Sequence, residues 1–434
     1  MHDLCNTTES KSRNPFRGFA APFAESRAFP FLWLGHLISF LGSSVTMVIL
    51  PVLVYSLTGS TTIMGIVMAV YMLPNIIMLP ISGHIVDRYD RVKIMMLADI
   101  ARFLIMLATA ALSLIGVLTI PLLLVLVGFY GLLDGLFQPA YAAVRATIFT
   151  PNIRVAANAL TQMTTQTVRL IGPALGGILI THLSAGVGFG MDAFTYLMSL
   201  VCLIYLRKVL LNKSNSEIAK PPTSSIAQPL ESSPNWKQDF MEGIAVLRSQ
   251  PWLWITILAF SFINICYAGI TSILVPWLFK VHHGWEPYIY GLAVTFSGVG
   301  AIIGGLLFGM RPKWNHRGFM AYGGAFLSGL ALLLLPFAPN AISAIALFAL
   351  EGFGLMIFGL IWEISLQELV PQEAFGRVAS LDLLGSFALL PIGYILVGWL
   401  ADLIGGVTTI AIFAGLGMTC IGVVLSVPSI RKFQ

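Results

Sequence analysis

The residues in this sequence best suited to chemistry are charged side chains inside long apolar stretches. They are Asp99, Arg102, Asp134, Arg169, Glu351, Glu363 and Asp382. A charged side chain at the centre of a bilayer costs roughly 3 kcal/mol on insertion scales, so such groups are functional candidates. A carboxyl group removed from water favours its neutral form, which suits the uptake and release of a proton. The pattern therefore indicates proton-linked chemistry within a membrane.

Two arrangements of these groups are expected. Asp134 and Arg169 fall at mid-depth of their apolar stretches, where an ion pair could exchange partners when a proton binds. A static pair that holds helices together is an equal alternative. Glu351 and Glu363 lie roughly 18 Å apart along one helix, without an obvious basic partner in the second half of the sequence. We rank these glutamates slightly above Asp134 as proton carriers, with Arg169 organising the pair or anchoring an anionic substrate.

Other polar groups within the apolar stretches have simpler interpretations. Asp99 and Arg102 are three residues apart and suit a local structural pair. Asp192 and Asp402 fall near the ends of apolar stretches, where water can reach them, so we set both aside. The uncharged hydrogen-bonding groups expected at cavity depth are Gln138, Gln162, Gln166 and Asn264.

The sequence offers no constellation for covalent or metal chemistry. Cys5, Cys202, Cys266 and Cys420 have no metal-ligand spacing, and the histidines form no H-x-x-x-H pair. A nucleophile–base arrangement and a Walker A loop are also missing from the sequence. We therefore expect no enzyme, no resident cofactor or metal, no disulfide framework and no direct use of ATP.

Long apolar segments carry the candidate residues. The 434 residues are 57% hydrophobic and 10% charged, whereas a soluble domain carries about 25% charged residues. Apolar runs of about 20 residues cross a bilayer as helices. The expected spans are 30–57, 63–85, 92–116, 119–148, 156–183, 187–206, 252–279, 287–309, 318–338, 340–369, 376–403 and 407–428. This predicts an all-α membrane protein with 12 transmembrane helices in two pseudo-symmetric six-helix bundles.

Polar segments divide the chain into parts. We expect a tail at 1–29, a first bundle at 30–206, a linker at 207–250, a second bundle at 251–428 and a tail at 429–434. Serine, proline and asparagine give the linker its composition, and its end at 236–248 has the apolar spacing of a surface helix. The first segment lacks the apolar core of a signal peptide.

The distribution of lysine and arginine predicts the orientation. With the N-terminus in the cytoplasm, 21 of the 24 basic residues fall on the cytoplasmic side, and only Lys280 falls on the opposite side. Cytoplasmic loops carry such an excess, so both termini and the linker are predicted to be cytoplasmic. The net charge of +5 then suits contact with anionic lipid and needs no nucleic-acid partner.

The two halves also share a weak internal repeat. GHIVDRYDR at 83–91 follows the second span, and GMRPKWNHR at 309–317 follows the eighth. Paired halves are the usual build of secondary transporters.

The first of these segments resembles a family signature. With Gly83, Asp87 and Arg88, it is similar to the loop between helices 2 and 3 of the major facilitator superfamily, although Asp90 and Val92 depart from the usual form. Further segments resemble the macrolide-efflux and enterobactin-exporter-like branch of that superfamily. They are LWLGHLIS at 32–39, LTGS at 57–60, ANAL at 157–160, RLIGPALGG at 169–177 and GRVASL at 376–381.

The resemblance implies a gate. In the family this loop forms a charge cluster that bridges the two halves when the cavity opens outward. Here Asp87, Arg88, Arg91 and Asp382 would form the cluster. Gly83 would let its helix approach a neighbour closely. An ordinary cytoplasmic loop with topology-setting arginines is the alternative.

The resemblance also implies a direction of transport. Gly172, Pro173, Gly176 and Gly177 resemble the helix-5 motif associated with exporters, with plain helix packing as the alternative. His36 stands where the branch usually has Gln, and the sequence assigns it no role.

Together these features predict a secondary active transporter. We expect a proton-coupled exporter of a small amphipathic molecule, working by alternating access in the bacterial cytoplasmic (inner) membrane. A hydrophobic drug and a siderophore-like metabolite are both open as substrates. The expected partners are the substrate, protons and membrane lipid, and we expect a monomer. A lipid flippase or a non-transporting membrane receptor on the same fold is the alternative, and it would lack proton-dependent flux.

Overall fold

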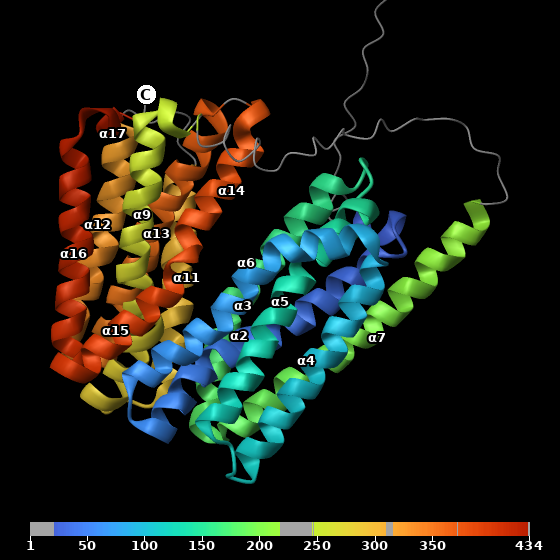
Figure 1. Ribbon diagram of the computed structural model, residues 1–434, viewed down its shortest axis with the longest axis horizontal. Helices are drawn as coiled ribbons and strands as arrows, with labels where there is room; N and C mark the ends of the chain where they lie inside the picture. The colour runs from blue at the N-terminus through green and yellow to red at the C-terminus, as the bar shows by residue number, and fades with distance from the viewer. Residues whose placement is uncertain (1–20, 218–244, 246, 310–315, 371, 433–434) are drawn as a thin grey trace, which may run out of the picture.

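The secondary structure in the described part of the chain is helical. The computed structural model describes residues 21–217, 245, 247–309, 316–370 and 372–432. Its long helices form two groups, α2–α7 and α9–α17 (Figure 1). The predicted all-α architecture is therefore confirmed.

The helices of the first group match the predicted spans closely. They are α2 (Phe29–Thr58), α3 (Thr61–Arg88), α4 (Arg91–Leu114), α5 (Ile120–Ile148), α6 (Arg154–His182) and α7 (Ala185–Glu217). Polar side chains fix two of the boundaries. The Ser60 hydroxyl accepts from the Ile63 amide at the start of α3, and the Asp90 carboxylate accepts from the first amides of α4. Such caps satisfy amide groups that a helix end leaves unpaired.

The second group contains more interruptions. Its elements are α9 (Pro251–Gly269), η1 (Ile270–Leu274), α10 (Val275–Trp277), η2 (Leu278–His282), α11 (Pro287–Gly309), α12 (Arg317–Leu334), η3 (Leu335–Phe337), α13 (Ala341–Leu369), α14 (Gln372–Ala388), α15 (Leu390–Ile404), α16 (Gly406–Ser426) and α17 (Pro428–Lys432). The predicted span 376–403 is two helices with a break at Leu389. Pro391 follows the break, and proline cannot donate to the preceding turn.

Eleven helical stretches in the described chain are long and apolar enough to cross a membrane. α6 is 29 residues long but less apolar, because its central turns carry Gln162, Gln166 and Arg169. The count of twelve spans therefore stays a prediction.

The predicted bundle boundary at 206 falls inside a longer helix. α7 continues to Glu217, beyond the expected bundle end at 206, because the polar residues after 206 extend the helix instead of ending it. The expected surface helix at 236–248 falls mainly outside the residues that the structure describes.

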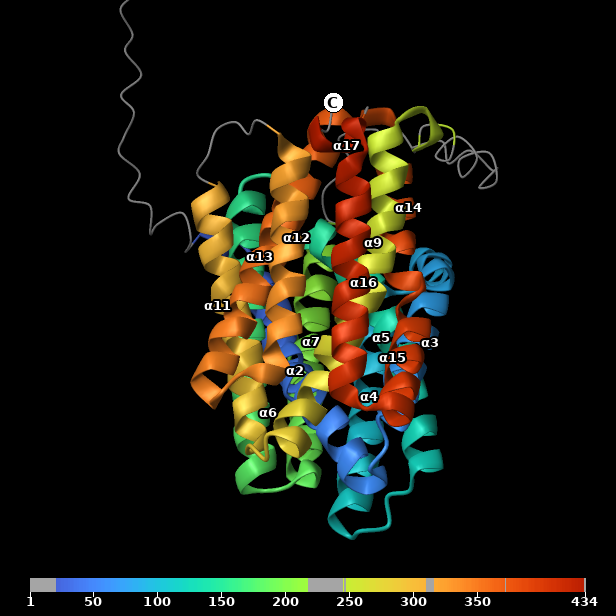
Figure 2. The same cartoon turned by 90° about the vertical axis from the view of Figure 1, so that its left-hand side faces the viewer.

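The two helix groups touch toward one end and diverge toward the other (Figure 1). α3 packs against α15, and α6 packs against α11. We call the end with Thr61 and Ile404 the contact end, and the end with Arg88 and Arg154 the diverging end. Turned by 90°, the view shows α9, α12 and α16 side by side in front of the first group (Figure 2).

Candidate functional site

A buried ion cluster lies inside the first helix group. The Arg102 guanidinium on α4 donates to the Asp99 carboxylate at 2.5 Å and to the Asp134 carboxylate of α5 at 3.0 Å. Its side chain is only 3% exposed. The guanidinium carbon also lies 4.1 Å from the ring centre of Phe137 and 4.7 Å from that of Tyr196. Arginine is thus held by two anions and two aromatic faces, an arrangement that offsets its removal from water.

This cluster corrects the predicted Asp134–Arg169 ion pair. The partner of Asp134 is Arg102, whereas Arg169 is exposed on α6. α5 packs against α3 and α4, so Asp134 faces those helices. Asp134 and Arg169 both lie near the middle of their helices, but the sequence could not indicate which helices are neighbours. The expected local pair of Asp99 with Arg102 is present.

A polar stripe on α7 extends the cluster. The Ser199 hydroxyl donates to Asp99 at 2.7 Å. One turn earlier, the Tyr196 hydroxyl lies 2.7 Å from that of Tyr130 and 2.8 Å from that of Ser43. The stripe therefore joins α7 to α2, α4 and α5 through hydrogen bonds.

Asp192 begins this stripe and corrects a second expectation. It is fully buried, with 0% exposure. Its carboxylate accepts from the Thr46 hydroxyl at 2.6 Å and from the Thr195 hydroxyl at 3.3 Å. The expected water access fails because α2 packs closely here: a side chain on Gly42 would meet Asp192 Oδ1 at 2.4 Å. The spacing of 192, 195, 196 and 199 places four polar groups on one helix face, a signal that could have revealed the stripe from the sequence.

A small cavity lies among α2, α3, α4, α5 and α7. It measures about 10 Å³, room for about one water molecule. Thr46, which donates to Asp192, and Tyr71, which donates to Asp134 at 2.8 Å, both line it. The cavity therefore borders one hydroxyl partner of each carboxylate, while most of its other lining side chains are apolar.

The two glutamates of α13 lie in different surroundings. Glu351 is 5% exposed and accepts from the Ser297 hydroxyl of α11 at 2.9 Å. Glu363 is exposed and accepts from Gln367 on its own helix at 2.8 Å. Twelve residues turn a helix by about 120°, so the two carboxylates point in different directions. Of this pair, Glu351 is the one removed from solvent.

One face of α6 carries several of the predicted cavity groups. Gln162, Gln166, Arg169 and Pro173 recur at intervals of four, three and four residues, which places them on one side of the helix. Pro173 lies against α11, because a side chain on Gly291 would meet its carbonyl oxygen at 2.3 Å. The polar groups on the same face therefore face the second helix group. They lie on the part of α6 between Pro173 and the diverging end.

The other predicted cavity residues differ from one another. Gln138 is exposed on α5. Asn264 on α9 donates to the Ser386 carbonyl at 2.8 Å, which joins α9 to α14. His36 stacks on the buried Tyr141 ring, with 4.1 Å between ring centres, so it packs α2 against α5.

The glycines of the predicted helix-5 motif lie at helix contacts. A side chain on Gly172 would meet Ser44 Oγ at 2.2 Å, and one on Gly176 would meet the Val45 carbonyl oxygen at 2.9 Å, so both residues pack against α2. Gly177 faces the other group, because a side chain placed there would meet the Cα of Tyr288 at 2.9 Å. The motif therefore lies where α6 meets both α2 and α11.

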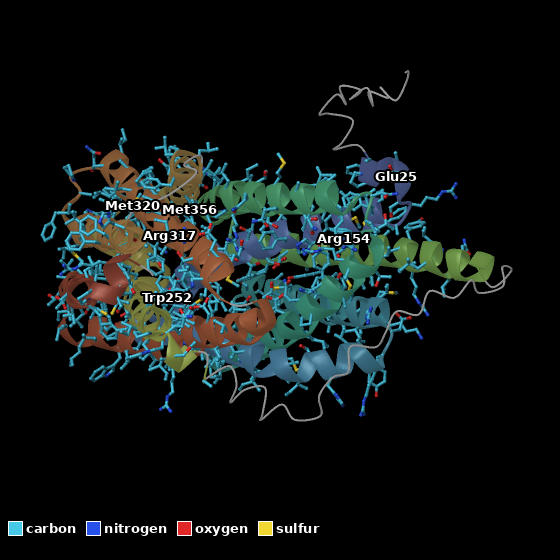
Figure 3. The ribbon with its side chains drawn as sticks, turned by 90° about the horizontal axis from the view of Figure 1, so that it is seen from above. Glu25, Arg154, Trp252, Arg317, Met320 and Met356 are labelled. Atoms are coloured by element: carbon cyan, nitrogen blue, oxygen red, sulfur yellow. The ribbon has the colours of Figure 1, made fainter. Side chains whose placement is uncertain are left out.

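Among the described side chains, no ion pair joins Asp382 to Arg88 or Arg91 in this conformation. Arg88 and Arg91 are exposed, and Asp382 accepts from Trp362 Nε1 at 3.1 Å. The side chain of Asp87 is outside the described residues. A Cβ added to Gly83 would meet no atom of the described residues within 4 Å, so no described helix makes the expected close approach there. The reason is that the two groups diverge at this end, where Arg154 lies in the first group and Arg317 in the second (Figure 3).

The sequence of most of the helical region decides the family. The model of the Major Facilitator Superfamily matches residues 32–386. The chain belongs to this superfamily. It is therefore a multi-pass membrane transporter and not an enzyme.

Individual members of the superfamily are similar over most of the chain. Macrolide efflux protein A of Streptococcus pyogenes is 24% identical, covering 93% of this chain and 96% of the relative. Enterobactin exporter EntS of Shigella flexneri is also 24% identical, covering 94% and 93%. Among solved structures, a bacterial homologue of the iron transporter ferroportin in an inward-facing state matches with a TM-score of 0.69 at 16% identity, covering 91% of this chain and 98% of that one. The last likeness shows the fold.

Proposed function

We propose that this transporter is a proton-coupled exporter of a small amphipathic molecule. The observation that carries the proposal is the sharing of Arg102 between two carboxylates inside the first helix group. In the described cluster, Asp99, Asp134 and Asp192 accompany this one guanidinium. Three ionised carboxylates would leave a net negative charge in a low-dielectric interior, which favours proton binding.

Asp134 is the carboxyl group best placed to exchange the proton. Its side chain is 19% exposed, whereas that of Asp99 is fully buried. Breaking a buried ion pair is costly when it leaves a charge unpaired. Protonation of Asp134 would leave no charge unpaired, because Arg102 keeps Asp99 as its anion. The ion pair with Asp134 can therefore open without stranding the guanidinium.

Glu351 is proposed as a second proton site. It is buried in the second helix group and bonded to a hydroxyl group of α11. Glu363 is less favoured, because its exposed carboxylate keeps contact with solvent and with Gln367.

Alternating access is supported by the way the two helix groups meet. The contacts of α3 with α15 and of α6 with α11 lie toward one end. The charge-based orientation puts the diverging end in the cytoplasm, so this conformation corresponds to the inward-facing state. We propose domain boundaries at 30–206 and 251–428, with the linker 207–250 and both termini in the cytoplasm of a bacterial cell.

The substrate site is proposed on the inner face of α6. Gln162 and Gln166 would offer hydrogen bonds, and Arg169 would attract an anionic group. The names of the relatives, a macrolide efflux protein and an enterobactin exporter, support an amphipathic cargo of either the drug or the siderophore type. An anionic siderophore-like cargo would require Arg169; a neutral or cationic drug would not.

Flux in proteoliposomes with an imposed proton gradient tests the proposed function. Ethidium serves as a cationic drug probe, and 2,3-dihydroxybenzoylserine serves as an anionic catecholate probe. We expect uphill transport of at least one probe that stops when a protonophore collapses the gradient. Transport of neither probe, or transport insensitive to the gradient, would contradict proton-coupled export and favour a flippase or a receptor.

The proposed orientation predicts the labelling of the linker. A cysteine placed at Ser224 should react with a membrane-impermeant maleimide only after the cells are opened. A cysteine at Val117, exposed at the contact end, should react in intact cells. Labelling of the linker in intact cells would reverse the topology and the assignment of the gate.

The gate predicts a loss of transport on removal of one charge. Asp87→Asn should abolish transport while expression and membrane insertion stay at wild-type levels, because the carboxylate is needed in the outward-open state. Glu368→Gln is the control, since Glu368 is 53% exposed at the same end. Full transport by Asp87→Asn would support the ordinary-loop interpretation.

A further inference from the structure

At the contact end, a carboxylate of one helix group caps a helix of the other. Asp402 Oδ1 of α15 accepts from the Thr61 amide at 2.9 Å and from the Thr61 hydroxyl at 2.7 Å. Asp402 Oδ2 accepts from the Thr62 amide at 2.9 Å and from the Ser60 hydroxyl at 2.6 Å. Four donors at the start of α3 therefore converge on one carboxylate from the second group.

The charges of the two helix ends explain this contact. The N-terminus of α3 carries partial positive charge, and its first turn contains no acidic residue. Asp402 lies two residues before the end of α15 at Ile404, where the dipole of its own helix disfavours a carboxylate. The position of Asp402 is thus unfavourable for α15 alone and becomes favourable when α15 touches α3.

The backbones approach closely beside this carboxylate. The Thr61 hydroxyl oxygen also lies 2.8 Å from the Gly398 carbonyl oxygen, so its one proton is shared between that carbonyl and Asp402. A side chain on Gly398 would meet the Thr61 carbonyl oxygen at 2.3 Å, and one on Gly65 would meet that of Tyr394 at the same distance. Glycine at both positions therefore allows the approach that brings Asp402 within hydrogen-bonding distance of α3.

The contact between α6 and α11 uses uncharged partners. The Tyr288 amide of α11 donates to the Thr181 hydroxyl at 3.0 Å, and the Thr295 hydroxyl donates to the Leu170 carbonyl at 2.6 Å. Hydrogen bonds to an ionised group are roughly twice as strong as those between neutral groups. The carboxylate of Asp402 is therefore the strongest polar link described between α15 and α3.

We propose that Asp402 is a gating residue that holds the contact end shut and releases α3 when that end opens. The proposal rests on the alternating access proposed above. In the open state, water would replace the carboxylate at the first turn of α3, and Asp402, which is already exposed here, would lose its four donors. The residue acts by setting the balance between the two states, with no contact to the substrate.

The test measures that balance directly. Spin labels at Val117→Cys and Phe337→Cys report the separation of the groups at the contact end, because both positions are exposed and lie on opposite groups. The native cysteines are replaced with alanine. Pulsed electron resonance then compares the parent with Asp402→Asn and Asp402→Ala. Glu286→Gln is the matched control, since it removes an exposed carboxylate at the same end without touching α3.

We expect both Asp402 variants to raise the ratio of open to closed distances by about fivefold, as for the loss of a helix cap, while Glu286→Gln leaves the ratio unchanged. Ser60→Ala should raise the ratio less. Its effect should not add fully to that of Asp402→Ala in the double variant, because the two residues share one contact. A parental distance distribution in both Asp402 variants would overturn the proposal. The readout needs no substrate, so failure of this test is separate from failure of gradient-driven flux in the parent.

Discussion

Asp134→Asn will abolish uphill, gradient-driven efflux while leaving downhill exchange of substrate in place. The asparagine amide oxygen can still accept from Arg102, and its NH2 group can donate to the Tyr71 hydroxyl oxygen in place of the present bond, so the shape of the site is retained. It cannot bind and release a proton, so transport loses its link to the gradient. The measurement is paired uptake in proteoliposomes, once with an imposed proton gradient and once with substrate on both sides of the membrane.

Two further variants locate the proton sites. Glu351→Gln should also weaken uphill efflux, because Glu351 is buried without an ionic partner in the described chain, whereas Glu363→Gln should have the smaller effect because its carboxylate is exposed. Glu286→Gln is the control for loss of a remote carboxylate. Normal gradient-driven efflux in Asp134→Asn, Glu351→Gln and Glu363→Gln alike would assign these residues to helix packing.

Arg102→Met will destabilise the folded protein by about 3–5 kcal/mol, as expected when one partner of a buried ion pair is removed. Methionine fills much of the space between Phe137 and Tyr196, so lost packing contributes little. The main cost is two carboxylates, Asp99 and Asp134, left without their cation. Thermal unfolding in detergent, followed by intrinsic fluorescence, measures the change.

The same experiment has an internal rescue. Adding Asp99→Asn and Asp134→Asn to Arg102→Met removes the stranded charges, so stability should return toward the parent even though transport does not. Arg207→Met is the matched control, because Arg207 is 36% exposed and 3.9 Å from its partner Asp90, and exposed pairs of this kind contribute roughly 0–1 kcal/mol. Equal stability of Arg102→Met and Arg207→Met would contradict a charge-stabilised cluster.

The helix boundaries were predictable because they depend on local chemistry. Apolar length places α11 at the expected 287–309, and the cap residues Ser60 and Asp90 lie directly before α3 and α4. The break at Leu389 was missed because hydropathy stays high on both sides of it. Proline at 391 was the available signal.

The partners inside the helix groups were less predictable because they depend on which helices pack together. Asp134 and Arg169 were paired by depth alone, yet α5 packs against α4 and brings Asp134 to Arg102. Asp192 and Asp402 were set aside as solvated. Asp192 is instead buried against α2, whereas Asp402 is exposed as expected but also caps α3. Periodicity along α7 could have revealed the first, whereas the second required the contact between the two groups.

Proton movement driven by substrate tests the central claim most directly. Proteoliposomes containing the protein and a trapped pH-sensitive dye are given an outward or inward gradient of ethidium or of 2,3-dihydroxybenzoylserine, with no initial pH difference and the membrane potential clamped. The account predicts that protons move in the direction opposite to the substrate, so the internal pH rises when substrate enters and falls when it leaves. This pH change is present in the parent and is lost in Asp134→Asn. Substrate movement with no pH change in the parent would contradict proton coupling.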